Sequence, residues 1–308
     1  MLFPPLRLVL NTTCNGKCYF CHHEGAASGI NEMSLSLLSE CIEAAEHLNI
    51  SKISLTGGEP TLRNDLDEIV DMIKQKLPTV NLGITTNGFG LHRISQKTLD
   101  QLDQINLSIT SFCDTIIDKY QRVDPSITFK LLQPYAKKTT INIVVVGENK
   151  NSLISIIEHC FDFGFNVDLM FDLVSNDIPL QTEVLSSLTK KYGLFSIHYY
   201  STPVMMQYNN ARLQLRIKSP SISSIFCRSI CKQCPHRVHC SERICALRVY
   251  PNGRVSPCLN NYVISSQKTV YDQILDIYPK LGVDLTDLYS IVLRQHDTTT
   301  AHESLTVQ

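Results

Sequence analysis

Three cysteines near the start of the chain form the pattern best suited to chemistry. Cys14, Cys18 and Cys21 follow an apolar run in the stretch LRLVLNTTCNGKCYFCHHE, spaced C-x3-C-x2-C, so their thiolates share one short loop and can converge on one metal centre. A closed zinc site takes four protein ligands, and an iron–sulfur cube is usually held by four cysteines. Three cysteines therefore leave one metal position for a group that is not protein. The alternative is a zinc knuckle completed by His22 or His23.

A second cysteine cluster lies in the last third of the chain, spaced C-x3-C-x2-C-x5-C-x4-C-x12-C. Its members are Cys227, Cys231, Cys234, Cys240, Cys245 and Cys258. Thiols at this density predict metal ligation, either as a structural zinc ribbon or as iron–sulfur ligands. The scattered Cys41, Cys113 and Cys160 are interpreted instead as small buried apolar side chains.

Strand-like and helix-like segments alternate after the first cysteines. Apolar β-like runs lie at residues 52–56, 80–85, 105–109, 141–146 and 167–171. Helical spacing lies between them, at residues 34–50, 66–73, 99–102 and 153–161. This alternation predicts a parallel sheet, and about six βα units before residue 175 favour a partial barrel over a short doubly wound sheet. In either architecture the site lies at the carboxyl edge of the strands.

Polar motifs follow the strands of this predicted sheet. Gly57-Gly58-Glu59-Pro60 comes after the run ending at Thr56, where two glycines permit close backbone approach and a carboxylate can accept from an ammonium group. Thr85-Thr86-Asn87-Gly88 closes the next strand, although an Asn-Gly pair is also typical of a simple β-turn. Ser108 and Asn142 lie on the following two strands, where local hydrogen bonding is the alternative role.

Together these motifs resemble the radical S-adenosylmethionine (radical SAM) superfamily, and within it the GTP 3',8-cyclase branch, over most of residues 5–170. The resemblance implies that Cys14, Cys18 and Cys21 hold three irons of a [4Fe–4S] cluster whose fourth iron binds SAM. It also implies that the cluster reductively cleaves SAM to a 5'-deoxyadenosyl radical, which abstracts hydrogen from a substrate. The SAM-binding residues that it implies are Gly57, Gly58, Glu59, Pro60, Thr86, Asn87, Ser108 and Asn142.

The second cysteine cluster also resembles part of such enzymes. The stretch from Cys245 to Cys258 is similar to the strand, turn and strand that hold an auxiliary cluster, so the six cysteines are candidate ligands of an auxiliary [4Fe–4S] cluster. The cyclase spacing C-x2-C-x13-C is absent. Only Arg248 falls at a position like the paired triphosphate-binding arginines, with Ala246 at the other, and the basic tail of the cyclase is missing. Arg248 is therefore a weak substrate-binding candidate, and GTP is an unfavoured substrate.

The expected fold class is α/β, a partial (β/α)6 TIM-like barrel. We expect residues 1–217 to form the barrel, extended by the β-like segments FSIHYYST and RLQLRI, and residues 218–308 to form a small cysteine-rich auxiliary-cluster domain with a tail. The 308 residues are 43% hydrophobic and 19% charged with a net charge of −1, which disfavours nucleic-acid partners. No segment is long and apolar enough to cross a membrane.

The start MLFPPLRLVL lacks the features of a signal peptide, so a cytoplasmic location is expected. In that compartment twelve cysteines are more often metal ligands than disulfides. The leading hypothesis is a radical SAM enzyme acting on a small-molecule or nucleotide-derived substrate, with an electron donor such as flavodoxin or ferredoxin as partner. A radical SAM peptide maturase or dehydrogenase is the alternative, and a non-catalytic zinc or iron–sulfur binding protein is the alternative of another class.

Overall fold

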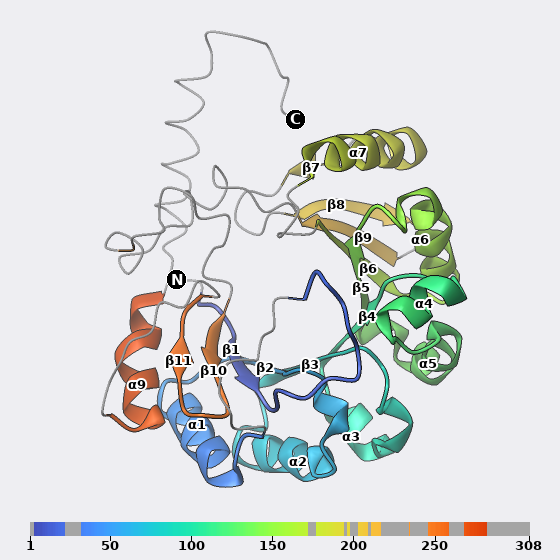
Figure 1. The fold of residues 1–308 in the computed structure, drawn as a ribbon. Helices are drawn as coiled ribbons and strands as arrows, with labels where there is room; N and C mark the ends of the chain where they lie inside the picture. Colours follow the sequence, from blue (N-terminus) through green and yellow to red (C-terminus); the bar gives the residue numbers. More distant parts are fainter. Residues whose placement is uncertain are drawn as a thin grey trace, which may run out of the picture.

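The computed structural model describes residues 3–21, 32–171, 177–193, 196–197, 203–208, 211–216, 234, 246–258 and 268–281. Its centre is a curved parallel sheet with helices on the outer, convex face (Figure 1). The six strands that carry the predicted motifs are neighbours in chain order: β1 (Leu6–Val9), β2 (Lys52–Thr56), β3 (Asn81–Thr86), β4 (Gln104–Ile109), β5 (Thr139–Val145) and β6 (Asn166–Phe171). The partial α/β barrel predicted from the alternating pattern is confirmed.

Helices return the chain between these strands. They are α1 (Leu35–His47), α2 (Leu66–Lys76), α3 (Gln96–Gln101), α4 (Asp114–Tyr120), α5 (Pro125–Leu132), α6 (Leu153–Asp162) and α7 (Ile178–Tyr192). Short 3-10 turns join them: η1 (Pro60–Leu62), η2 (Leu91–Arg93), η3 (Gln133–Lys138) and η4 (Lys150–Ser152). The apolar spacing that predicted α1 buries Leu38, Cys41 and Ile42 against the sheet, and the Ser34 side chain caps the helix by accepting from Leu37 N.

The sheet continues past β6 through a mixed extension. β9 (Ala211–Arg216) pairs with β6 in parallel, and β8 (Pro203–Tyr208) and β7 (Ser196–Ile197) follow in antiparallel order. The segments FSIHYYST and RLQLRI predicted two of these three strands. β8 was missed because its sequence, PVMMQY, begins with proline and lacks clear alternation.

The opposite edge is built from the end of the described chain. β10 (Leu247–Val249) pairs in parallel with β1, and β11 (Val255–Ser256) pairs with β10 in antiparallel order. α9 (Val270–Ile277) and η7 (Tyr278–Leu281) pack beside α1, where Glu40 Oε2 accepts from Val270 N at 3.1 Å. The division at residue 217 stays a prediction, but these parts of 218–308 share the hydrophobic core of the barrel.

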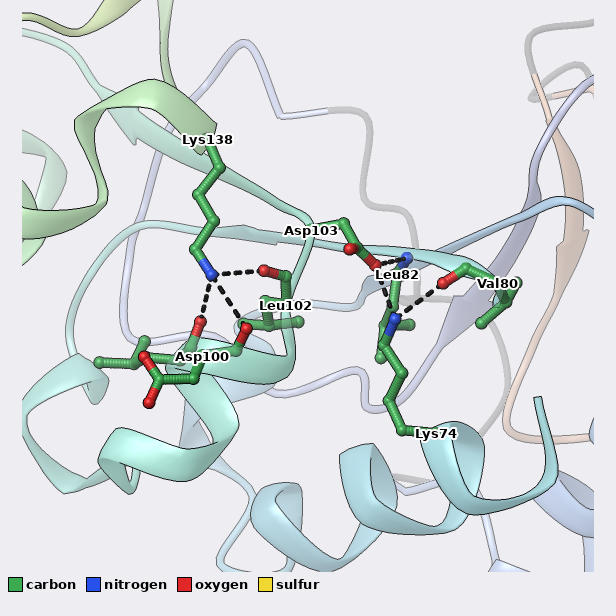
Figure 2. Close-up of polar contacts among 8 residues, drawn as sticks. Lys74, Val80, Leu82, Asp100, Leu102, Asp103 and Lys138 are labelled. Carbon is green, nitrogen blue, oxygen red and sulfur yellow. Dashed lines mark hydrogen bonds and ion pairs between the residues drawn. The ribbon is translucent and has the colours of Figure 1, made fainter. Parts of the chain in front are cut away.

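Two half-buried lysines organise the amino-terminal edge of the strands, opposite to the site (Figure 2). Lys138 Nζ, just before β5, donates to the carbonyl oxygens of Leu99, Asp100 and Leu102 at 2.7, 3.2 and 2.6 Å. It thereby satisfies carbonyl groups that α3 leaves unpaired at its end. Lys74 Nζ similarly bonds Val80 O at 2.8 Å and Asp103 Oδ2 at 2.7 Å.

Lys138→Met should lower the free energy of unfolding by about 1.5–3 kcal/mol, the usual worth of hydrogen bonds to a charged group. Methionine keeps the apolar stem but leaves three carbonyl groups without their donor. Urea unfolding followed by circular dichroism measures the change. Lys137→Met, a change at the adjacent exposed lysine, is the matched control and should stay within about 0.5 kcal/mol of the wild type.

Candidate metal and cofactor site

The cysteine loop starts from β1 and lies against the glycines that end β2. Gly58 N donates to Asn11 O at 2.9 Å, and Glu59 N donates to Thr13 O at 2.8 Å. A side chain at Gly58 would place its Cβ 2.2 Å from Thr13 O, and one at Gly57 would place it 2.2 Å from Asn11 Oδ1. Only glycine fits at both positions, so the pair predicted from the sequence is used for close backbone approach.

The far side of the cysteine loop is anchored to the end of α4. Lys17 N donates to Tyr120 O at 2.8 Å, and Asn15 Nδ2 donates to Gln121 O at 3.3 Å. Phe20, the aromatic residue before Cys21, is buried and packs edge-on against the Tyr120 ring. Hydrogen bonds and an aromatic contact thus position the loop from both of its sides.

Arg63 fixes the two ends of the cysteine-bearing segment. Its Nη1 donates to Leu10 O at 2.9 Å, before the cysteines, and to Met33 O at 2.7 Å, after them. The same guanidinium forms a two-pronged ion pair with Asp65, at 2.8 and 2.6 Å. Arg63 is only 7% exposed, so this pairing satisfies a buried charge. The sequence reasoning missed Arg63; its place three residues after Pro60 gave no signal beyond an ordinary charged residue.

Glu59 is the centre of the site's hydrogen-bond network. Its carboxylate is 1% exposed. Oε1 accepts from Thr61 N, Thr61 Oγ1 and Thr86 Oγ1 at 3.0, 2.6 and 2.6 Å, and Oε2 accepts from Asn87 N at 2.6 Å. The carboxylate therefore joins the motif after β2 to the motif after β3. That Glu59 also contacts the SAM ammonium stays a prediction. Four donors of the chain itself already bond to its carboxylate.

Asn87 carries this network to the first cysteine. Its Oδ1 accepts from Phe89 N at 3.0 Å, which turns its Nδ2 toward Asn15 Oδ1 at 2.9 Å and Cys14 Sγ at 3.8 Å. The next residue, Gly88, has a φ of +90°, a conformation that favours glycine. The chain does change direction here, through the Phe89 N bond to the Asn87 side chain and a Leu91 N bond to Gly88 O at 3.2 Å, and the Asn87 amide is directed at a cysteine of the predicted metal site.

Desolvation and a nearby cation have opposing effects on the pKa values of two of the thiols. Partial desolvation by the surrounding protein raises the pKa of surface-exposed Cys14 and of half-buried Cys18 above the ordinary thiol value, whereas the charge of Arg122 lowers both pKa values. Arg122 is held at the end of β4 by donating from Nη2 to Ser108 O at 3.1 Å. It therefore lies where it favours thiolate ligands, although nothing in its sequence context had marked it.

The other cysteines differ from the predicted pattern at one position. Cys41 and Cys160 are buried, as expected. Cys113 is exposed, so its interpretation as a buried apolar side chain was wrong; it precedes α4 at the surface and lies 3.1 Å from Thr115 Oγ1. This hydrogen bond is the main cause that lowers the pKa of Cys113.

In metal-free, reduced protein, Cys113 should react with iodoacetamide before Cys14 and Cys18 at pH 7.5. The attacking species is the thiolate, which is favoured at Cys113 by the Thr115 hydrogen bond and disfavoured at Cys14 and Cys18 by partial desolvation. Raising the pH to 9 should reduce the difference in labelling rate, because it populates the thiolate form of the two thiols whose pKa is raised. Peptide mass spectrometry with a time course measures the labelling rate of each cysteine. Faster labelling of Cys14 than of Cys113 at pH 7.5 would contradict this order of reactivity.

A row of polar residues crosses the concave face of the sheet. In β4 and β5, half-buried Ser108 and Asn142 alternate with fully buried apolar residues. Because the helices cover the convex face (Figure 1), this alternation places both residues on the inner face. Ser108 and Asn142 are register partners, and Asn142 is also the partner of buried Asp168 on β6.

The remaining predicted residues are only partly described. Arg248 lies on β10 and is 2% exposed. Its register partner on β1 is Arg7. Cys258 follows β11 and its carbonyl oxygen accepts from Ser256 Oγ at 2.7 Å. Cys234 is described without its neighbours, and Cys227, Cys231, Cys240 and Cys245 lie outside the described residues. The auxiliary cluster therefore stays a prediction.

The family model of the Radical SAM superfamily matches residues 8–160. These residues form a radical SAM domain. The probable GTP 3',8-cyclase of Pyrococcus abyssi is 30% identical over 188 residues, which cover 58% of each chain. The GTP 3',8-cyclase of Sulfurovum sp. is 28% identical over 210 residues, 62% of this chain and 64% of its own. The matches thus span less than two thirds of these curated relatives.

Solved structures share the radical SAM fold at low identity. Streptococcus suis SuiB bound to S-adenosylmethionine has a TM-score of 0.61 at 16% identity, covering 92% of this chain and 68% of its own. The structure of polyhistidine-tagged anSMEcpe with bound AdoMet has a TM-score of 0.59 at 16% identity, covering 90% of this chain and 82% of its own. At this identity the likeness establishes the fold and no more.

Radical SAM domains use a [4Fe–4S] cluster together with SAM, and the residues present fit this pair. Within the described part of the chain, no three His, Cys, Asp or Glu side chains converge on a single ion position. In an iron–sulfur cube each of the three cysteines binds a different iron, so their side chains do not need to converge on a single ion position. Among the residues that the structure describes, the buried Asn142 Oδ1 and Thr110 Oγ1 atoms have no hydrogen-bond partner, which is costly unless a ligand supplies one. No helix in the described ranges is both long and apolar enough to cross a bilayer.

Proposed function

We propose that this protein is a radical SAM enzyme in which Cys14, Cys18 and Cys21 hold the cluster that binds SAM. The observation that carries the proposal is the Glu59 network, because one buried carboxylate ties the glycine motif, Thr86 and Asn87 to the loop that bears Cys14. When bound, the cluster and SAM supply an electron and a 5'-deoxyadenosyl radical for hydrogen abstraction. The location in the cytoplasm and a flavodoxin- or ferredoxin-like electron donor belong to the same proposal.

The chain's own residues have distinct tasks in this site. Gly57 and Gly58 bring backbone within reach of the cysteine loop, and side chains at either position would collide with it. Arg122 favours deprotonated thiols. Ser108 and Asn142, on the inner face of the barrel, offer hydroxyl and amide groups to the donors and acceptors of SAM. The helices cover the opposite, convex face of the sheet, so these polar groups are presented on its concave side (Figure 1).

The substrate is proposed to be a small molecule or a nucleotide derivative. The curated relatives are named for GTP cyclisation. However, Ala246 replaces one of the two arginines expected for a triphosphate, and the other, Arg248, is buried in β10. A triphosphate needs several charge-assisted donors. GTP should therefore be a poor substrate, and a related but less charged compound is favoured.

A second candidate function is peptide modification. SuiB bound to its precursor peptide SuiA has a TM-score of 0.60 over 95% of this chain and 67% of its own. The C-x2-C-x5-C part of the second cysteine cluster, at Cys231, Cys234 and Cys240, is also similar to the extended auxiliary-cluster domain of peptide maturases. These observations favour a peptide as the first alternative substrate class.

Anaerobic reconstitution tests the proposal directly. Reduced protein with SAM should release 5'-deoxyadenosine, and the release should rise with the true substrate class in a panel of GTP, other nucleotides, sugars and peptides. Efficient conversion of GTP would overturn the substrate proposal. A chain that binds only zinc and leaves SAM intact would overturn the radical SAM proposal and favour the non-catalytic alternative.

Iron content separates one cluster from two. Reconstituted wild type should bind about eight irons if the C-terminal cysteines hold a second four-iron cluster, and about four if they do not. The triple variant with Cys231, Cys245 and Cys258 replaced by alanine should lose about four irons. It should keep uncoupled SAM cleavage and lose product. Stoichiometric zinc beside four irons in the wild type would establish the zinc alternative for the second cluster.

A further inference from the structure

Cys14 differs from an isolated thiol because two N–H groups point at its sulfur. Gly16 N donates to Cys14 Sγ at 3.3 Å from within the loop. Asn87 Nδ2, from the end of β3, lies at 3.8 Å from the same sulfur and shares its donor capacity with Asn15 Oδ1. One of the three cysteines of the motif therefore receives a side-chain donor from a different strand.

The direction of the Asn87 amide is fixed by its neighbours. Phe89 N donates to Asn87 Oδ1 at 3.0 Å, so the oxygen is committed and the NH2 end must face the cysteine loop. The backbone of the same residue is held through Asn87 N, which donates to Glu59 Oε2 at 2.6 Å. Asn87 is 7% exposed, so water does not compete freely for the amide.

Such a donor has a defined physical effect on a metal-bound thiolate. An N–H group directed at the sulfur stabilises negative charge there, and one-electron reduction adds negative charge to the cluster and its ligands. Hydrogen bonds to the sulfurs are accordingly among the features that set the potentials of iron–sulfur centres. The donor therefore stabilises the reduced cluster more than the oxidised one.

We propose that Asn87 is a positioning residue that raises the reduction potential of the cluster through its N–H···S hydrogen bond to Cys14. The inference rests on the proposed function, since it requires a cluster on these cysteines. It assigns Asn87 a role that differs from the SAM contact implied by sequence resemblance. Glu59 takes part indirectly, because it holds the backbone from which the amide is directed.

Redox titration of the reconstituted, SAM-free protein tests the inference without an activity measurement. Asn87→Asp keeps an acceptor for Phe89 N but replaces the NH2 donor with a carboxylate oxygen beside the sulfur. At one fixed potential its ratio of reduced to oxidised cluster, measured by electron paramagnetic resonance, should fall at least tenfold. A tenfold change is equivalent to about 59 mV for a one-electron couple. Asn87→Ala, which removes the donor without adding charge, should give a smaller fall of about threefold.

Asn15→Ala is the matched control. It removes the acceptor that competes with Cys14 for the Asn87 amide, and it also removes the Asn15 bond to Gln121 O, so it loosens the loop while keeping the N–H···S donor. Its ratio of reduced to oxidised cluster should equal or exceed that of the wild type. If this ratio fell in Asn15→Ala as much as in Asn87→Ala, the inference would be overturned, because loosening of the loop would then explain the fall in both variants.

Three outcomes distinguish this inference from the proposed function. Unchanged potentials in fully loaded Asn87→Asp and Asn87→Ala protein would overturn the inference and leave the proposed function intact. Loss of the cluster in both variants would also overturn it, since Asn87 would then be needed for assembly instead of for tuning. A wild type that binds no iron–sulfur cluster would overturn the proposed function and, with it, the inference.

Discussion

Replacing any one of Cys14, Cys18 or Cys21 by alanine is expected to reduce SAM cleavage to background while leaving the fold intact. Each cysteine is assigned a different iron, so no remaining residue of the loop can replace the lost ligand. Cys14 and Cys21 are exposed and Cys18 is half-buried, so little apolar area is lost. Release of 5'-deoxyadenosine under dithionite measures the activity, and thermal unfolding of the apo-protein measures the fold.

Cys113→Ala is the control for this series. Cys113 is exposed on the surface before α4 and belongs to neither cysteine motif, so its replacement should leave SAM cleavage unchanged. Substantial deoxyadenosine release by a Cys14, Cys18 or Cys21 variant would contradict the assignment of the cluster ligands.

Glu59→Gln should have the largest effect of any single-atom change in the site. Glutamine has the same shape, but its NH2 group must face either the Thr61 and Thr86 donors or Asn87 N, so at least one buried donor loses its acceptor. Leaving a buried donor unsatisfied costs about 1–3 kcal/mol, so the free energy of unfolding should fall by at least that amount. SAM affinity should also fall, because the two strand-end motifs are no longer tied together.

Guanidinium chloride unfolding and SAM binding by calorimetry measure these two effects. Glu43→Gln provides the matched control, since Glu43 is an exposed carboxylate on α1 that accepts only from Ser39 Oγ in the described contacts. It should change neither quantity by more than about 0.5 kcal/mol. A Glu59→Gln variant with wild-type stability would show that the glycine motif is held by other contacts.

The sequence was sufficient for features that depend on local pattern. Strands β2 to β6 were predicted within two residues of their observed bounds, because parallel strands buried on both faces read as short apolar runs between amphipathic helices. The cysteine loop and both strand-end motifs were found for a related reason. Glycines, prolines and closely spaced thiols can be recognised from the local sequence, because their conformational or chemical roles do not depend on knowing the tertiary fold.

Features that depend on long-range contact were not predicted. Arg122 and Arg63 contribute to the site only because the fold brings them to the cysteine segment. Likewise, β10 joins the sheet beside β1 across more than two hundred residues of sequence, and its short run of three residues gives no sign of its partner. The role of Glu59 as an acceptor for four donors also required the structure, because the donors come from two different strand ends.

The Arg63 clamp has a consequence for how this protein tolerates change. One guanidinium holds the backbone at Leu10 and at Met33, so the chain between them leaves and re-enters the barrel at two fixed anchor points. Replacing that one side chain would therefore release both ends of the cysteine-bearing segment at once. Asp65 would lose both contacts of its ion pair in the same step. The position of the three thiols thus depends on a residue that belongs to neither cysteine motif and that lies after the glycine motif in the sequence.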